Sequence, residues 1–185
     1  MVLIGEKISL KPAQPEDYQF IADWWGDPKY LGNFYNINPE TPETIQHFVE
    51  AMRQSGNAYL IIDKATKKPL GTIGYYCPFS MTPAFNGFEI WYQVHQDHRG
   101  RGLATQAASL LLNHLFNTTS INRIQATVVV GNDASCRVLE KSGLRKEGVM
   151  RGVWFLHGVY RDEHLYSIVR GDWVSDVDYR QRHAF

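Results

Sequence analysis

A glycine- and arginine-rich turn carries the clearest chemical signal in the sequence. It stands between a predicted strand and a long predicted helix, and its residues are Arg99, Gly100, Arg101, Gly102, Leu103, Ala104 and Thr105. Glycines lack Cβ atoms, so backbone amides can converge on a ligand, and the amino end of a helix adds unsatisfied donors and partial positive charge. Two arginines and no carboxylate surround this helix start, which is unfavourable unless a ligand supplies negative charge. The turn therefore predicts a pyrophosphate site.

Two other phosphate-binding motifs fit this turn poorly. A P-loop needs Lys and then Ser or Thr after its second glycine, where this chain has Leu103 and Ala104. A dinucleotide-binding fingerprint needs a third glycine or an alanine where Thr105 stands. The remaining alternative is a solvated turn before a surface helix.

Apolar periodicity places the turn in an α/β domain. In the helix expected over about 102–116, Leu103, Ala107, Leu111 and Leu115 recur every four residues, as in a helix packed flat on a sheet. Strands expected at 88–94 and 124–130 flank this helix and imply one parallel crossover. The other expected strands are 8–11, 58–63, 70–76, 149–156 and 163–169, and the other expected helices are 15–25, 42–54 and 132–143.

These elements predict a mixed, mostly antiparallel sheet of six to seven strands with helices on both faces. The 185 residues contain no repeat or low-complexity linker, so we expect a single domain over 1–185 in which 171–185 form a C-terminal tail. Between the first two helices, we expect residues 29–40 to be irregular.

Charge and composition exclude several kinds of partner. Lys plus Arg and Asp plus Glu both number 19, so the chain has no overall field to gather nucleic acid or an anionic membrane. Two distant cysteines, no signal peptide and no membrane-length apolar run predict a cytoplasmic protein. His95 and His98 lack a third ligand, so we expect no metal site.

Three segments together resemble the GNAT superfamily of N-acetyltransferases, in particular its branch that acetylates ribosomal proteins. The segments are Arg99-x-x-Gly102-x-Ala104, residues 132–144, and residues 158–162 with Tyr166 beyond. The resemblance extends from about Ile8 to Arg170. It implies acetyl-CoA as co-substrate and direct transfer of the acetyl group to a primary amine in a ternary complex.

The resemblance also implies roles for individual residues. Backbone groups near Val94 and from Arg99 to Thr105 would hold the pantetheine and the pyrophosphate. Asn132 would touch the pantetheine region, although asparagine is also an excellent helix N-cap. Val94 would supply a backbone donor to the thioester carbonyl.

Two side chains are candidates for proton transfer. Glu89 is the candidate base, because the family often places a catalytic glutamate on this strand; alternation puts it on one face with Trp91 and Gln93. An exposed or cross-strand-paired glutamate is the alternative. In many family members a tyrosine donates the proton from the position where this chain has Leu139. Ser135 therefore becomes the candidate acid here, and the alternative is that its hydroxyl only satisfies backbone donors. Tyr160 and Tyr166 are weaker candidates.

The acceptor side is expected around an aromatic segment. Trp25, Asp27 and Tyr35, together with Glu89, are the candidate substrate-binding residues, since aromatic faces and carboxylates attract amines. Packing of the tryptophan on the sheet is the alternative. The acceptor is expected to be a protein N-terminus or a small-molecule amine, and a homodimer is compatible with the aromatic content. A coenzyme-binding sensor without catalysis is the alternative function.

Overall fold

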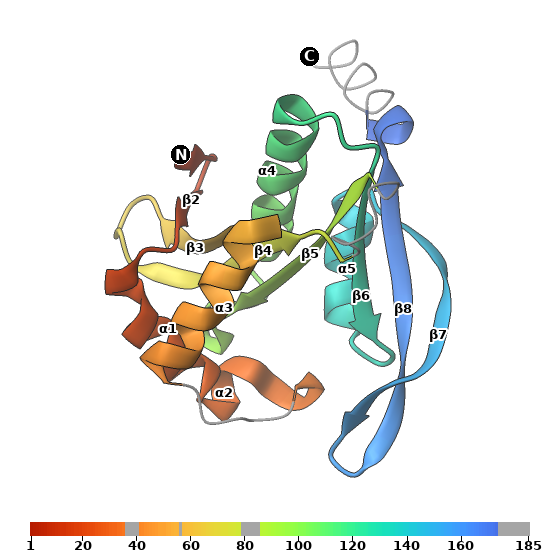
Figure 1. Ribbon diagram of the computed structural model, residues 1–185, viewed down its shortest axis with the longest axis horizontal. Coiled ribbons are helices and arrows are strands. Elements are labelled where there is room, and N and C mark those ends of the chain that lie inside the picture. The colour runs from red at the N-terminus through yellow and green to blue at the C-terminus, as the bar shows by residue number, and fades with distance from the viewer. Residues whose placement is uncertain (36–40, 56, 79–85, 174–185) are drawn as a thin grey trace.

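One twisted sheet organises the described chain, which comprises residues 1–35, 41–55, 57–78 and 86–173 of the computed structural model (Figure 1). Its eight described strands follow the order β1-β2-β3-β4-β5-β6-β8-β7. The strands are β1 (Leu3–Ile4), β2 (Ile8–Pro12), β3 (Asn57–Asp63), β4 (Pro69–Tyr76), β5 (Gly87–Val94), β6 (Arg123–Val129), β7 (Arg145–Leu156) and β8 (Val159–Val169). The α-helices are α1 (Tyr18–Trp25), α2 (Pro28–Leu31), α3 (Pro42–Ser55), α4 (Leu103–Thr118) and α5 (Asp133–Lys141).

The sheet divides between β5 and β6. These strands are parallel and are connected through α4, whereas the other strand pairs are antiparallel. Their ladder covers only Gly87–Glu89 against Arg123–Gln125, so the two strands separate beyond Glu89. A gap between strands exposes backbone groups that a sheet normally pairs, which makes it a natural place for a ligand.

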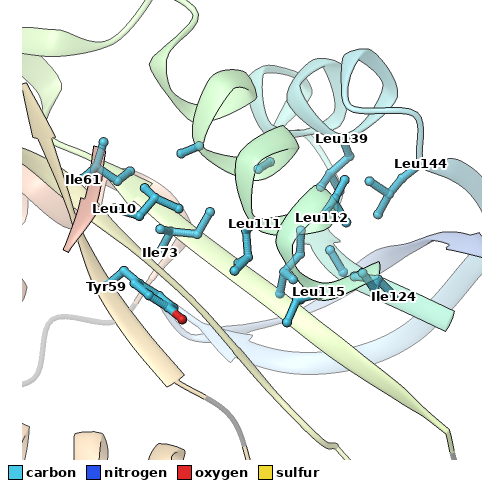
Figure 2. Packing of buried hydrophobic residues seen from close by; sticks show 14 of the residues in the cluster. Leu10, Tyr59, Ile61, Ile73, Leu111, Leu112, Leu115, Ile124, Leu139 and Leu144 are labelled. Atoms are coloured by element: carbon cyan, nitrogen blue, oxygen red, sulfur yellow. The ribbon is translucent and has the colours of Figure 1, made fainter. Parts of the chain in front are cut away.

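Helices cover both faces of the sheet. On one face the apolar stripe of α4 packs on the strands, and Figure 2 shows Leu111, Leu112 and Leu115 against Ile73 and Ile124. Those five side chains are at most 2% exposed, as a close-packed core requires. On the other face α1 and α3 form a second, smaller cluster with β3.

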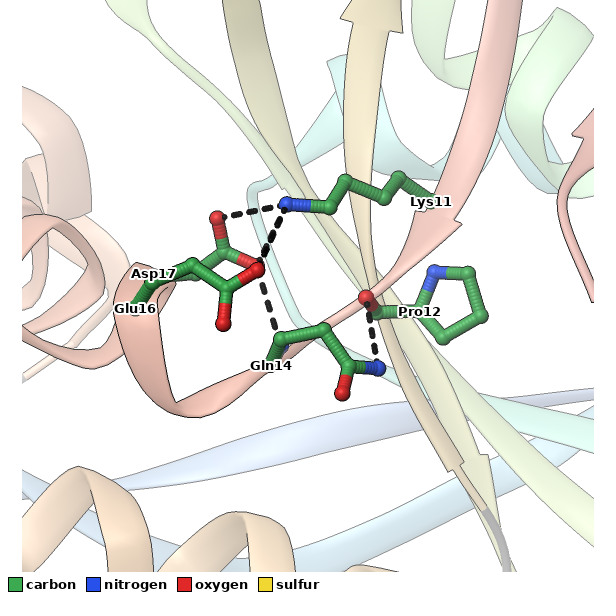
Figure 3. A network of polar contacts seen from close by, with 5 residues as sticks. All are labelled: Lys11, Pro12, Gln14, Glu16 and Asp17. Carbon is green, nitrogen blue, oxygen red and sulfur yellow. Dashed lines mark hydrogen bonds and ion pairs between the residues drawn. The ribbon is translucent and has the colours of Figure 1, made fainter.

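A polar network fixes the entry of α1, which leads toward the acceptor segment. Pro15–Asp17 form a 3₁₀ turn, and the Asp17 carboxylate accepts from the backbone amide of Gln14 at 2.9 Å and from Lys11 Nζ at 3.0 Å (Figure 3). The side chain thus satisfies a backbone donor that a helix start leaves without a partner.

The predicted fold class is confirmed. The main differences are a two-residue strand, β1, that is too short to show a pattern, and helical turns in α2 where an irregular segment was predicted. Residues 36–40 of that segment lie outside the described residues, as do residues 174–185 of the predicted tail. Trp173 stacks on Phe116 of α4 with ring centroids 5.2 Å apart. None of the described helices is long and apolar enough to cross a bilayer.

Candidate active site

The glycine turn opens α4 as the sequence predicts. Gly100 and Gly102 have φ angles of +76° and +73°, a region that side-chain-bearing residues rarely adopt. A Cβ atom added at either glycine would meet nothing within 4 Å, so the turn borders open space. No side chain caps the helix and its first turn contains no acidic residue, so the first amides of α4 face that space with the positive end of the helix dipole.

The two arginines of the turn differ in their contacts. The Arg99 guanidinium donates from Nε to the Val94 carbonyl at 2.9 Å and from an Nη to the Tyr30 carbonyl. It therefore ties the turn to α2. Arg101 is exposed and donates to the Asp97 carbonyl at 3.1 Å, beside the open space. The sequence predicted positive charge at this helix start but not the bond that connects Arg99 to α2.

A cavity of about 580 Å³ occupies the separation of β5 and β6. Its lining includes residues of α1, α3 and the α2 region on one face of the sheet and residues of α5 on the other. The described lining residues are Trp25, Phe34, Tyr35, Phe48, Tyr76, Glu89, Ile90, Trp91, Tyr92, Gln93, Ala126, Thr127, Val128, Val129, Asn132, Ser135, Leu139, Trp154, Leu156 and Glu163. The cavity therefore joins Asn132 and Ser135 of the predicted coenzyme side to the predicted acceptor side, whereas Val94 and the turn 99–105 are not among its described lining residues.

Glu89 lines this cavity with both carboxylate oxygens engaged. Oε1 accepts from the Tyr76 hydroxyl at 2.9 Å, and Oε2 accepts from Gln125 Nε2 at 2.9 Å. Tyr76 and Gln125 are its partners on the neighbouring strands, so the sheet itself fixes the orientation. The negative charge of Glu89 and burial of the ring raise the pKa of Tyr76, which keeps that hydroxyl protonated as a donor.

This carboxylate is the end of a longer chain of polar contacts. Gln125 Oε1 accepts from Arg123 Nε at 3.0 Å, and Arg123 pairs in a bidentate manner with Glu147 at 2.9 and 2.6 Å. Glu147 also accepts from the Ser167 hydroxyl. The network fixes the amide of Gln125 so that its NH₂ group, rather than its oxygen, faces Glu89.

Ser135 lies at the opposite wall of the cavity, in the first turn of α5. Its Oγ is 2.8 Å from the hydroxyl oxygen of Tyr92, and the Tyr92 hydroxyl donates to the Ser135 carbonyl at 3.1 Å. Burial raises the pKa of Tyr92, so this phenol remains protonated near neutral pH. Asn132 caps α5 by accepting from the Ser135 amide at 3.2 Å, and it also lines the cavity. Both interpretations of Asn132 from the sequence can therefore hold together.

The other tyrosine candidates lie elsewhere. The Tyr160 side chain is 74% exposed at the tip of the β7–β8 hairpin, and the Tyr166 hydroxyl donates to Glu140 at 3.0 Å. Neither is among the described lining residues, whereas Leu139, the position where the resemblance implies a tyrosine in many family members, lies in the wall. The structure brings Tyr92 to Ser135 instead, and no pattern in the sequence pointed to Tyr92 beyond its place on the strand before the glycine turn.

The predicted acceptor residues are only partly brought together. Trp25 and Tyr35 line the cavity, and the Trp25 ring also packs edge-on against Phe48 and Trp91 at 4.9 and 5.7 Å. Asp27 instead accepts from the Lys29 amide at 2.8 Å and is not among the described lining residues. From the sequence we also expect the loop 77–86 to close the other side of the acceptor site, and most of this loop lies outside the described residues.

Glu163 of β8 is a lining residue that the sequence did not single out. It is 5% exposed and pairs with Val129 of β6 across the sheet. Burial raises the pKa of its carboxyl, hydrogen bonds from Trp154 and Thr127 oppose this shift, and the charge of Glu89 adds to it. A single glutamate in a predicted strand carries no pattern that marks it as buried.

Comparison with known proteins identifies the family. Residues 7–145 match the model of the acetyltransferase (GNAT) domain, and the chain belongs to this family. It is 34% identical over 174 residues to the uncharacterized N-acetyltransferase YoaA of Bacillus subtilis, covering 91% of this chain and 97% of the relative. The chain is thus an acetyl-CoA-dependent N-acetyltransferase.

More distant relatives show which acceptors the family includes. The ribosomal-protein-serine acetyltransferase of Escherichia coli is 26% identical, with 81% of this chain and 83% of that protein aligned. The spermidine N-acetyltransferase of Vibrio cholerae, solved with CoA and spermine, superimposes with a TM-score of 0.78 at 18% identity, covering 92% and 99% of the two chains. The latter likeness concerns the fold alone.

Proposed function

We propose that this enzyme transfers the acetyl group directly to a primary amine within the cavity between β5 and β6. The observation that carries the proposal is that one continuous cavity reaches both Glu89 and Ser135. An acceptor amine and a thioester can therefore meet there without a covalent enzyme intermediate. Holding two reactants in this way accounts for a large part of the rate enhancement in such reactions.

The residues around the α4 start fit acetyl-CoA, which supplies the acetyl group as a thioester. The left-handed glycines leave room for a diphosphate where side chains would otherwise project, and the backbone of Arg99 to Thr105 offers its donors. Arg101 adds an exposed positive charge. Val94, which ends β5 just before the turn, and Asn132, which lines the cavity, would contact the pantetheine arm.

Glu89 is the proposed base. Its carboxylate would take a proton from the bound ammonium, directly or through a water molecule, and so provide the neutral nucleophile. An α-amine with a pKa near 8 is already about one-tenth neutral at pH 7, whereas a lysine-like amine near 10.4 is neutral only about once in a few thousand molecules. The contribution of Glu89 is therefore largest for alkyl amines.

The Ser135 and Tyr92 hydroxyls are the proposed source of the proton that the departing sulfur needs. They form one hydrogen-bonded pair on the wall formed by α5, opposite Glu89. Since burial holds Tyr92 in its protonated form, its hydroxyl can turn from the Ser135 carbonyl to Oγ while Ser135 donates its own proton toward the cavity.

We further propose that this enzyme is cytoplasmic, because Cys77 and Cys136 are both free thiols.

The proposed homodimer contact is the β7–β8 hairpin, where Val153, Val159 and Tyr160 are exposed. Sedimentation velocity of the wild type and of Val153→Asp tests this contact. The wild type should sediment as a dimer and the variant as a monomer, and the same assembly mass for both proteins would contradict the contact.

Release of free thiol from acetyl-CoA over a panel of amines tests the proposed reaction. We expect Glu89→Gln to lower kcat by about 10² with an unchanged Kd for CoA in calorimetry. Glu50→Gln on the exposed side of α3 makes the same chemical change away from the cavity and should leave both unchanged. Coenzyme binding without thiol release from any amine would instead identify a sensor.

A further inference from the structure

The cavity contains a second carboxylate that the proposed proton transfers do not use. Glu163 reaches the cavity from β8 and lies on the same sheet face as Glu89. Glu89 pairs with Gln125 and Glu163 pairs with Val129, and Gln125 and Val129 are four residues apart on β6, so their side chains point to one face. Its described partners are the neutral donors Trp154 and Thr127. Hydrogen bonds from neutral groups orient a carboxylate but leave its charge uncompensated.

The lining is otherwise suited to a cation. None of the lining residues that the structure describes is Lys, Arg or His, while two are glutamates and eight are aromatic. Glu89 and Glu163 interact unfavourably with each other, which is visible as an electrostatic contribution to the raised pKa of Glu163. Two like charges facing one cavity are stabilised when a ligand brings positive charge between them.

Two further polar atoms on the same wall have no partner within the described chain. They are Trp91 Nε1 and Gln93 Oε1, both buried and both from lining residues of β5. A buried amide oxygen without a donor is costly, and an ammonium group or a peptide N–H would satisfy it. A carboxylate placed there would meet neutral donors, such as the indole N–H groups of Trp25 and Trp91, and no cationic side chain of the described lining.

We propose that Glu163, together with Glu89, binds the ammonium form of the acceptor and restricts it to primary amines whose α-carbon carries no carboxylate. A free α-amino acid would bring a third negative charge into a wall without a cation. Amines next to an amide or alkyl group, such as a peptide N-terminus or an alkyl amine, avoid this cost. This inference rests on the proposed function and specifies the acceptor class of the same cavity.

Matched pairs of acceptors test the selection without any mutation. Phenylalaninamide and phenylalanine have the same side chain and differ at the carboxyl group, as do alaninamide and alanine. We expect kcat/KM of the wild type to favour each amide by at least about 100-fold, consistent with the cost of an unpaired desolvated charge. A dipeptide and phenethylamine, added as two further acceptors, separate peptide-like from small alkyl acceptors within the class.

The variant Glu163→Gln tests the residue itself. The glutamine keeps the shape and an oxygen for Trp154 and Thr127 but removes the charge. We expect KM for phenylalaninamide to rise at least about tenfold, kcat to change less than about threefold, and the preference for the amide to fall by at least about tenfold. Glu50→Gln should change none of these values. Direct binding of the amines to the CoA-loaded protein, followed by tryptophan fluorescence, should show the same loss of affinity.

The results separate this inference from the proposed function. If amines are acetylated but the wild type accepts phenylalanine as well as its amide, or Glu163→Gln keeps the wild-type KM and preference, the role of Glu163 is refuted while the reaction stands. If no amine is acetylated, fluorescence still decides whether Glu163 selects amines, and the proposed transfer fails on its own.

Discussion

The hydroxyl of Tyr92 lies 2.8 Å from Oγ of Ser135, which joins β5 to the first turn of α5 across the opened sheet. These residues are 43 positions apart in the chain, and the crossover through α4 brings them together. Leu139 of α5, where the resemblance implies a tyrosine in many family members, has no hydroxyl, and Tyr92 provides the cavity with a phenol from β5 instead.

Removing either hydroxyl should slow the transfer without weakening coenzyme binding. We expect Tyr92→Phe and Ser135→Ala each to lower kcat by about 10- to 100-fold, because both belong to one proton path. The double variant should be little slower than either single variant, since groups that act as a unit are not additive. Steady-state kinetics with a saturating amine measures this. Multiplicative losses would show that the two hydroxyls act independently.

The glycine turn should lose its ligand when a methyl group is added. Gly102→Ala places a Cβ in the open space beside the α4 start and forces a left-handed φ on alanine, which costs about 1–2 kcal/mol of stability. We expect the Kd for CoA in calorimetry to rise at least about tenfold, because the amides can no longer converge on the diphosphate.

Gly152→Ala is the matched control for this turn. Gly152 has φ of +63° and equally open surroundings, but it lies in β7. It should lose similar stability and keep its affinity for CoA. An unchanged affinity in Gly102→Ala would mean that the diphosphate lies elsewhere.

Local patterns were sufficient to predict the backbone of the site. The glycine spacing and the four-residue apolar repeat predicted the phosphate turn and α4, because both features depend on residues close together in the chain. Alternation likewise placed Glu89 with Trp91 and Gln93, and all three line the cavity. The fold class depends on the order of such elements and could be predicted for the same reason.

Contacts between distant segments could not be predicted in this way. Arg99 stands 69 residues from Tyr30, and its bond to the Tyr30 carbonyl depends on where α2 packs. The continuous β-branched run of the strand 124–130 predicts burial on both faces, yet Thr127 is only half-buried because the sheet opens beside it. That opening is also why the burial of Glu163 was not foreseen.

The bidentate pair of Arg123 and Glu147 should give a stability contribution with a defined pH range. Hydrogen bonds from Arg123 and then Ser167 lower the pKa of Glu147 to about 2. A lowered carboxyl pKa stabilises the folded state above the unfolded value near 4.3, and this contribution is lost as pH falls from there to about 2. Because the Glu147 side chain is 40% exposed, solvent screening limits the contribution to about 1 kcal/mol or less.

Urea unfolding of Glu147→Gln checks this range. The variant should be less stable than the wild type at pH 7, and the difference should vanish as pH approaches about 2. It should also lower kcat modestly, since Arg123 orients Gln125 and through it Glu89. A constant difference across this pH range would show that the charge of Glu147 is not responsible.

The buried Glu163 should have the opposite pH dependence. Burial raises the pKa of its carboxyl, so the folded protein keeps this proton to a higher pH than the unfolded chain does. The contribution of Glu163 to stability is then highest below its unfolded pKa near 4.3 and falls as pH rises through its raised folded pKa. Glu163→Gln removes that loss, so the variant should be at least as stable as the wild type at pH 8 in urea unfolding.

An acceptor amine should stabilise the wild type more than the variant, because its ammonium group compensates the charge that the fold leaves unpaired. A variant that is less stable at pH 8 would instead show that Glu163 already has a favourable partner in the protein.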